Sequence, residues 1–210
     1  MKIAILIFPR LTALDAVGPY EVLSRLPGAE LTFVAPDPGE LRTDTGRLGI
    51  TADAALGDLT DPDILVVPGG VGNRVLLSDK SVLDWIRKAD ETTKWTTSVC
   101  TGSLLLGAAG LLEGKKATSH WAYRETLRDY GAEPVAERVV EDGKLITAAG
   151  VSAGIDMGLT LAARLQGGDV AKAIQLGIEY DPDPPFDAGS PEKAGEDLVN
   201  LIRALQEAEE

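Results

Sequence analysis

A single cysteine, Cys100, stands where a β-branched run ends and a helix-like run begins. Small residues lie two positions before it, at Ser98, and two positions after it, at Gly102. This spacing is typical of a nucleophile elbow, a tight turn that needs small flanking residues and holds the nucleophile above the sheet. A helix N-terminus beneath the sulfur favours thiolate, the reactive form. We therefore predict a nucleophile, although a lone thiol is more commonly a buried structural cysteine.

Two other segments carry groups that can assist a nucleophile. Gly69 and Gly70 end another buried run, and their backbone N–H groups can form an oxyanion hole together with the N–H of Thr101. The alternative for this glycine pair is a plain tight turn. Asp15 follows the first apolar run, where it can act as an acid or base beside the thiol. Its alternative role is to cap the helix that follows.

The only histidine is His120, which precedes Trp121. A Cys–His pair is a common way to activate a thiol. Because Thr101 directly follows Cys100, His120 must approach from another loop, and its alternative role is a hydrogen-bonded histidine near the core. We place His120, Trp121 and Gly150 as candidate pocket residues. One histidine and one cysteine exclude the usual zinc sites, so we expect no metal.

Alternating strand-like and helix-like runs predict the elements that position these groups. We expect strands at 3–8, 31–35, 63–67 and 95–99, short edge strands within 42–53, a hairpin over 138–147, and helices at 14–26, 81–91, 101–112, 121–130, 152–165, 169–180 and 191–209. This alternation predicts an α/β fold with a mostly parallel sheet covered on both faces. Ligands bind such sheets outside the carboxyl ends of the strands. Residues 8–15, 68–72, 100–102 and 148–152 all fall at such ends.

Composition excludes several classes of protein. The 210 residues, of which 44% are hydrophobic, suit one domain with a real core. A net charge of −13 argues against nucleic-acid binding. The apolar run Ile3–Phe8 is too short for a signal peptide, and no apolar segment is long enough to span a bilayer. One cysteine cannot form an internal disulfide, so we expect a cytoplasmic protein.

Taken together, these segments resemble the ThiJ/PfpI superfamily. The matching segments are 5–9, 14–19, 66–70, 98–102 and 118–121. Within the superfamily the chain is most similar to the branch of the isonitrile hydratases, through 98–112, 137–140, 153–156 and the Pro-rich segment 179–191. The peptidase-like members carry histidine directly after the cysteine, where this chain has Thr101, which argues against peptidase activity.

The resemblance implies a flavodoxin-like three-layer sandwich, similar to class I glutamine amidotransferases, and a homodimer. We expect a single domain over 1–210, with the Pro-rich loop and C-terminal helix of 181–210 packed on it. The resemblance also implies hydration of a small isonitrile to an N-substituted formamide, without a metal or organic cofactor. It places Cys100 as the nucleophile, Asp15 as the acid/base and Thr101 in a supporting position.

These assignments lead to a mechanistic hypothesis. Burial keeps Asp15 protonated, Asp15 protonates the isonitrile carbon, and the Cys100 thiolate attacks that carbon to form a thioimidate. Ionised Asp15 then activates water, and collapse releases the formamide while the N–H groups of Gly70 and Thr101 stabilise the developing charge. Two alternatives stay open. One is a glyoxalase- or deglycase-like enzyme acting on small aldehydes, and the other is a redox sensor in which Cys100 is oxidised.

Overall fold

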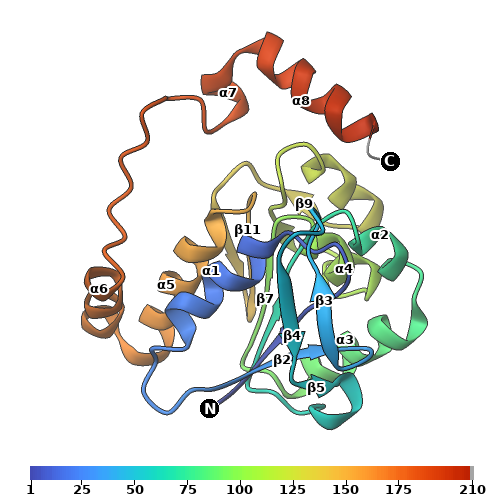
Figure 1. The fold of residues 1–210 in the computed structure, drawn as a ribbon, viewed down its shortest axis with the longest axis vertical. Coiled ribbons are helices and arrows are strands. Elements are labelled where there is room, and N and C mark those ends of the chain that lie inside the picture. Colours follow the sequence, from blue (N-terminus) through green and yellow to red (C-terminus); the bar gives the residue numbers. More distant parts are fainter. Residues whose placement is uncertain (209–210) are drawn as a thin grey trace. The chain divides into compact units, whose positions relative to one another are not determined.

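The computed structural model describes residues 1–208 and divides into two compact units, 1–178 and 179–210. The first unit is built on a seven-stranded sheet in the order β10-β11-β7-β6-β1-β2-β5 (Figure 1). Its strands are β1 (Lys2–Leu6), β2 (Glu30–Ala35), β5 (Ala54–Ala55), β6 (Ile64–Val67), β7 (Trp95–Val99), β10 (Val139–Asp142) and β11 (Leu145–Ala148). Every neighbouring pair is parallel except the β10–β11 hairpin. The predicted mostly parallel α/β sheet is therefore confirmed.

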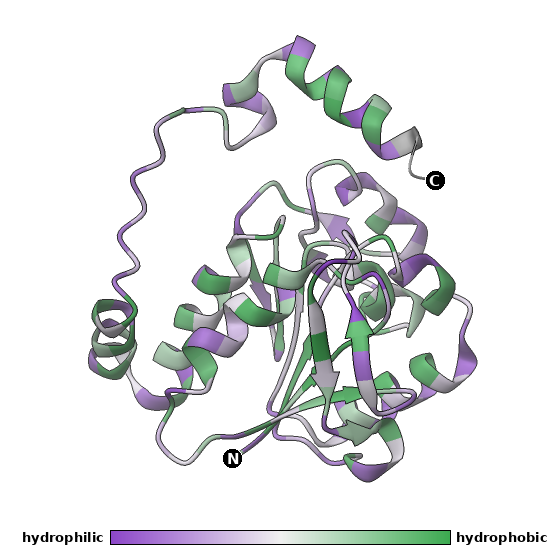
Figure 2. Cartoon of the chain, viewed as in Figure 1, coloured by the Kyte–Doolittle hydropathy of each residue, from purple (hydrophilic) through white to green (hydrophobic). Residues whose placement is uncertain are grey.

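Helices cover both faces of this sheet, which explains why β6 consists of buried aliphatic residues along its whole length. Figure 1 shows α1 (Ala13–Leu23) and α5 (Ala153–Gln166) on one side, and α3 (Lys80–Thr92) and α4 (Gly102–Ala108) on the other. α6 (Gly168–Gly177) packs on α5. Hydrophobic colouring follows the central strands in Figure 2, while the covering helices carry both colours. This is the three-layer arrangement expected for a flavodoxin-like fold.

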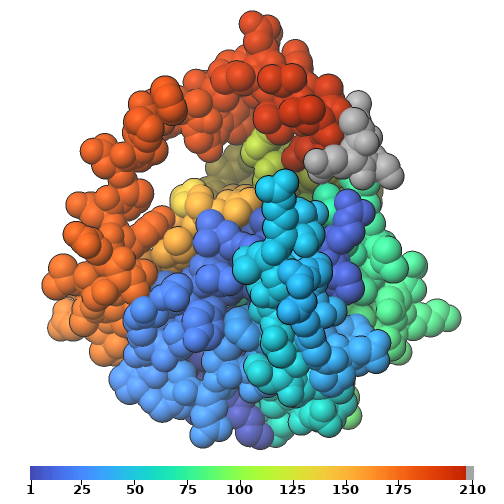
Figure 3. Space-filling view, in the orientation of Figure 1, coloured from blue at the N-terminus to red at the C-terminus, as the bar shows by residue number. Residues whose placement is uncertain are grey.

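Shorter elements complete the first unit. They are β3 (Gly39–Arg42), β4 (Gly49–Ala52), η1 (Leu56–Asp58), α2 (Asn73–Leu76), β8 (Lys116–Ala117), η2 (Arg124–Tyr130) and β9 (Glu133–Pro134). The antiparallel hairpin of β3 and β4 binds the loop after β1, because Arg10 N–H donates to Arg42 C=O and Asp44 N–H donates to Leu11 C=O. Figure 3 shows this hairpin, in light blue and cyan, on the surface of the molecule.

The second unit contains α7 (Pro191–Ala194) and α8 (Glu196–Ala208) after an irregular, Pro-rich segment. The helix predicted over 191–209 is therefore interrupted, because Gly195 adopts a φ of 83° between the two helices. Glu209, the last residue of that prediction, lies outside the described residues. The packing of residues 181–210 on the domain stays a prediction.

Two helices are shorter or tighter than expected. The helix predicted over 101–112 ends at Ala108, and the chain turns through Gly110, whose φ is 80°. The helix predicted over 121–130 is a 3₁₀ helix that begins only at Arg124. In η2 only Leu127 is buried, so little packing is available to hold a regular α-helix there.

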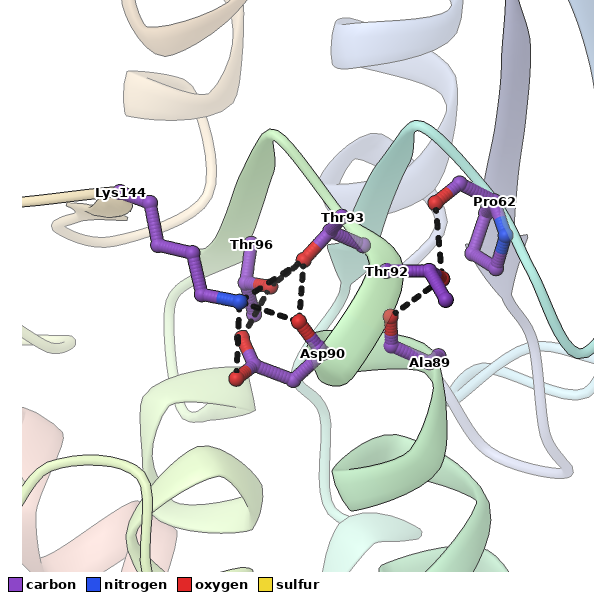
Figure 4. Close-up of polar contacts among 7 residues, drawn as sticks. All are labelled: Pro62, Ala89, Asp90, Thr92, Thr93, Thr96 and Lys144. Carbon is purple, nitrogen blue, oxygen red and sulfur yellow. Dashed lines mark hydrogen bonds and ion pairs between the residues drawn. The ribbon is translucent and has the colours of Figure 1, made fainter.

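A polar network joins the amino ends of β7 and β11 (Figure 4). Lys144 Nζ pairs with Asp90 Oδ2 at 3.0 Å, and the Thr96 hydroxyl donates to Asp90 Oδ1 at 2.6 Å. Thr93 and Thr96 share a hydroxyl–hydroxyl bond of 2.7 Å. The network therefore fastens the end of α3 to two strands, at the opposite end of β7 from Cys100.

Candidate active site

The four segments predicted at the carboxyl ends of the strands meet at one edge of the sheet. Thr12 N–H donates to Gly69 C=O at 3.0 Å, which joins the loops after β1 and β6. Gly70 N–H donates to Thr101 Oγ1 at 3.0 Å, which joins the loop after β6 to the start of α4. Cys100 N–H donates to the C=O of Ala149 at 3.0 Å, which adds the loop after β11. Two backbone–backbone bonds and one bond to the Thr101 side chain therefore bring the four loops together.

Cys100 occupies the strained turn between β7 and α4. Its φ is 58°, a left-handed conformation that is unfavourable for a side chain and concentrates at functional sites. Its C=O accepts the hydroxyls of Ser103 at 3.1 Å and Ser119 at 3.0 Å. A Cβ at Gly102 would lie 2.0 Å from the Val67 carbonyl oxygen, so this flanking position must be glycine. The geometry is that of a nucleophile elbow.

Asp15 is fully buried in the first turn of α1. Its Oδ2 accepts the Gly69 N–H at 2.9 Å, while its Oδ1 has no hydrogen-bond partner among residues 1–208. The alternative role as a helix cap is wrong, because Thr12 holds the N-cap position of α1. Burial raises the pKa of Asp15 to about 7, against the opposing effects of the Gly69 N–H and the Cys100 thiol.

The Cys100 thiol and the Asp15 carboxyl act on each other directly. Burial is the main cause that raises the pKa of the thiol, and the Asp15 carboxylate raises it further, while the N–H groups of Val151 and Thr101 lower it. This differs from the expectation that the helix N-terminus favours thiolate, because α4 has 7 residues and the loss of solvent outweighs its dipole. The resting thiol therefore keeps its proton, and the carboxyl beside it can take that proton during reaction.

The expected backbone donors have partners of their own in this structure. Gly69 N–H holds the Asp15 carboxyl, and Gly70 N–H holds the Thr101 hydroxyl. Their role as oxyanion donors stays a prediction. In this structure the two N–H groups hold the Asp15 carboxyl and the Thr101 hydroxyl in place. Sequence reasoning missed Asn73, whose buried Nδ2 donates to Thr101 C=O at 2.9 Å. A single polar side chain at the start of a four-residue helix, directly after a glycine-rich loop, has no periodic signal that would predict its burial.

The candidate pocket residues lie beside the loop after β11. A Cβ on Gly150 would be 2.7 Å from His120 Cδ2, so the imidazole packs directly on this loop. The ring centroid of His120 lies 5.5 Å from that of Trp121 and 6.1 Å from that of Tyr123. Burial lowers the pKa of His120, and its Nδ1 accepts the Ala122 N–H at 3.3 Å, so the ring is neutral at pH 7. Their contact with a substrate stays a prediction.

Residues 1–208 contain neither a metal-ligand cluster nor a membrane-spanning helix. No group of three or more His, Cys, Asp or Glu residues in this range is placed to hold a metal ion. None of the helices in the same range has the length and hydropathy needed to cross a membrane.

The fold and the site together define a class of proteins. The chain carries a cysteine on a strained strand-to-helix turn of a parallel α/β sheet, beside a buried carboxyl group in the first turn of α1. Residues 1–164 match the DJ-1/PfpI family, and this chain belongs to that family.

Comparison with individual relatives covers nearly the whole chain. The chain is 46% identical over 203 residues to the isonitrile hydratase of Pseudomonas putida, across 97% of this chain and 89% of that protein. It is 42% identical to a ThiJ/PfpI family protein from Pseudomonas syringae, whose crystal structure superposes with a TM-score of 0.94 over 98% of this chain and 86% of that one. Protein DJ-1 homolog A of Arabidopsis thaliana is 34% identical over 81% of this chain, which spans only 44% of that longer protein.

Proposed function

We propose that this protein is an isonitrile hydratase that converts R–N≡C and water into the formamide R–NH–CHO through a covalent thioimidate on Cys100. The observation that carries the proposal is the unpartnered Oδ1 of Asp15, a fully buried oxygen on a carboxyl that acts directly on the thiol. Hydration of an isonitrile needs a proton at carbon and a nucleophile at the same carbon, and this pair supplies both. The 46% identity to the Pseudomonas putida isonitrile hydratase over 97% of this chain supports the same assignment.

The first step adds the S–H group of Cys100 across the isonitrile carbon. Asp15, whose pKa is about 7, takes the thiol proton as its carboxylate and delivers a proton to carbon. Sulfur donates an electron pair to the same carbon, the C≡N π pair moves to nitrogen, and the product is the thioimidate R–N=CH–S–Cys100. The N–H groups of Val151 and Thr101 stabilise the charge that develops on sulfur.

The second step hydrolyses the thioimidate. Asp15 is again the carboxylate, and it removes a proton from a water that attacks the thioimidate carbon and passes that proton to the thioimidate nitrogen, which returns Asp15 to its carboxylate form. The tetrahedral intermediate R–NH–CH(OH)–S–Cys100 then breaks its C–S bond and releases R–NH–CHO. The proton from the hydroxyl returns to the sulfur through Asp15, so the enzyme ends in its starting protonation state. Thr101 holds the loop after β6 in place through its hydroxyl during both steps.

Further properties belong to the same proposal. We propose that the protein works as a homodimer in the cytoplasm, without a metal or organic cofactor, on a small-molecule isonitrile. A single cysteine suits a reducing compartment, and a net charge of −13 disfavours nucleic acid and anionic membrane surfaces as partners.

Incubation of the purified protein with cyclohexyl isocyanide tests the proposal, with N-cyclohexylformamide measured by chromatography. The same preparation receives methylglyoxal in a parallel assay and mild peroxide in another. We expect formamide at a rate that far exceeds any conversion of the aldehyde. Conversion of methylglyoxal without formamide would transfer the assignment to aldehyde substrates. Oxidation of Cys100 without turnover of either compound would instead favour the redox sensor.

A further inference from the structure

Two segments that resemble the isonitrile hydratases, 137–140 and 153–156, are far apart in sequence and are joined in the structure by one side chain. Arg138 Nε donates to Asp156 Oδ2 at 2.7 Å, and its second guanidinium nitrogen donates to the Ser152 hydroxyl at 3.1 Å. Asp156 lies in the first turn of α5, and Ser152 holds the N-cap position of that helix. The Arg138 side chain therefore fastens the edge of the sheet to the start of α5.

The backbone of Arg138 leads to the nucleophile by a second route. The β10–β11 register pairs Val139 with Ala148, so Arg138 lies opposite Ala149. The Arg138 C=O accepts the Ala149 N–H at 2.9 Å, and the Ala149 C=O in turn accepts the Cys100 N–H at 3.0 Å. Arg138 thus holds both ends of the loop 149–152, one end through its main chain and the other through its guanidinium group.

The residue between these two anchors is strained. Val151 has a φ of 38°, which is strongly unfavourable for a β-branched residue and persists only where the surroundings enforce it. The Val151 backbone N–H is a hydrogen-bond partner of the Cys100 thiol and lowers the pKa of that thiol. Such a strained residue needs a loop that is held at both ends, which Arg138 provides.

We infer that Arg138 is a positioning residue for the nucleophile, which clamps the loop 149–152 so that the Val151 N–H faces the sulfur of Cys100. This inference deepens the proposed function, on which its catalytic meaning rests. The clamp itself can be tested without any isonitrile, because Cys100 is the only cysteine and its alkylation reports the thiol alone.

A matched control lies on the same two elements. Arg164, near the C-terminal end of α5, forms a two-pronged pair with Glu141 of β10 at 3.0 and 3.1 Å. Both arginines are about half exposed, with side-chain exposures of 50% for Arg138 and 57% for Arg164. Each arginine links α5 to the region of β10: Arg138 from the residue before β10, and Arg164 from α5 to Glu141 of β10. Only Arg138 adjoins the loop 149–152.

The experiment measures the rate of Cys100 alkylation by iodoacetamide from pH 6 to 10 in the wild type, Arg138→Ala, Arg138→Lys, Asp156→Asn and Arg164→Ala. Loss of one N–H bond to a thiolate changes its stability about tenfold, so Arg138→Ala should react about tenfold more slowly at pH 8, with its profile moved to higher pH. Arg138→Lys keeps the charge pair and should recover part of the rate. Asp156→Asn should also slow the alkylation of Cys100, whereas Arg164→Ala should react at the wild-type rate.

Titration of neighbouring groups is controlled in the same series. Asp15 on α1 faces the thiol, His120 packs on the loop at Gly150, and Asp156 pairs with Arg138. Repeating the wild-type and Arg138→Ala profiles in an Asp15→Asn background removes the titration of Asp15 from the comparison. The shift caused by Arg138→Ala should persist there.

Two outcomes would overturn the inference. One is an unchanged alkylation profile in Arg138→Ala. The other is a shift of the same size in Arg164→Ala, because the arginine would then act only through general stability. A protein that alkylates as predicted but yields no formamide would keep the clamp and remove the proposed function. If Arg138→Ala does not fold, Arg138→Lys and Asp156→Asn decide by the same criterion.

Discussion

The carboxyl group of Asp15 combines full burial, one hydrogen bond to Gly69 and one oxygen without a partner among the described residues. Burial raises its pKa to about 7, against the lowering effect of the Gly69 N–H, so the carboxyl group can hold or release a proton at neutral pH. The sequence could predict Asp15 and Cys100 because each follows a recognisable apolar run. It could not predict Asn73 or Val151, because one acts through a loop contact and the other through its backbone N–H.

The raised pKa of Asp15 makes the stability of the protein depend on pH. The buried group is favoured in its protonated form, so its contribution is fully present below pH 3.8 and is lost as pH rises through about 7. The difference between these values corresponds to roughly 4 kcal/mol. Relative to Asp15→Asn, which does not titrate, the wild type should lose about that much unfolding free energy between pH 4 and pH 8. Denaturant unfolding of both proteins at the two pH values measures it.

Asp79 offers a control with the opposite sign. The Ser81 hydroxyl lowers the pKa of this helix-capping carboxyl, so its contribution is present above its ordinary value and is lost toward acid pH. Asp79→Asn should therefore lose stability relative to the wild type at pH 8 and not at pH 2.5.

A wild type whose unfolding free energy changes with pH in the same way as that of Asp15→Asn would show that Asp15 is not buried as described.

At the scale of elements, β7 carries chemistry at its carboxyl end and a stabilising network at its amino end. The predicted strand 95–99 and the observed β7 have the same bounds. The β-branched residues of this run favour a strand by their own preference, so the strand can be recognised from the local sequence. The prediction of a helix over 121–130 was wrong in type and start, because only Leu127 of η2 is buried and the apolar spacing in the sequence does not produce a packed helix face. The convergence of four loops was predictable, since the carboxyl ends of parallel strands share one edge.

The elbow should not tolerate a residue larger than glycine at position 102, two residues after the cysteine. Gly102→Ala would place a methyl group 2.0 Å from the Val67 carbonyl oxygen, so the backbone must move. We expect a loss of about 1–3 kcal/mol in unfolding free energy, together with a large loss of turnover. Gly168→Ala is the control, because a Cβ there meets nothing within 4 Å. Calorimetry and the formamide assay measure both variants, and a fully active Gly102→Ala would contradict the geometry of the elbow.

The network at the other end of β7 should affect stability alone. Lys144→Met leaves Asp90, whose side chain is only 16% exposed, without its ammonium partner. Loss of such a partner costs about 1–3 kcal/mol, which chemical denaturation can measure. We expect kcat/KM to stay unchanged because the network is remote from Cys100. Lys172→Met, which removes an exposed pair with Asp169, should change neither quantity.

At the scale of the whole molecule, the alternation of strands and helices was enough to predict the α/β class. The strands and helices that form the layers each have a recognisable pattern in the local sequence. The division of the chain into two units was not predicted, although the Pro-rich segment 179–191 begins directly after residue 178. The proposed homodimer rests on resemblance, and no sequence pattern points to its interface. The net charge of −13 belongs to the whole chain, and it should make the stability of the protein depend on salt.

Self-repulsion of that charge should make stability depend on salt. Screening of like charges by about 0.3 M NaCl should raise the melting temperature at pH 8 by a few degrees. Repeating the scan at about pH 4.5, where many carboxylates are protonated, should remove most of this effect. Differential scanning calorimetry at both pH values provides the comparison. A melting temperature that falls with salt at pH 8 would mean that attractive pairs dominate the surface.

The central claim, that Cys100 attacks the isonitrile carbon, is tested most directly by the rate of N-cyclohexylformamide formation from cyclohexyl isocyanide in Cys100→Ala and the wild type. Removal of a covalent nucleophile costs several orders of magnitude, so we predict a rate at least about 1,000-fold lower in the variant. Circular dichroism and a melting scan on the same samples establish that the variant is folded. A folded Cys100→Ala that forms the formamide at the wild-type rate would contradict the account.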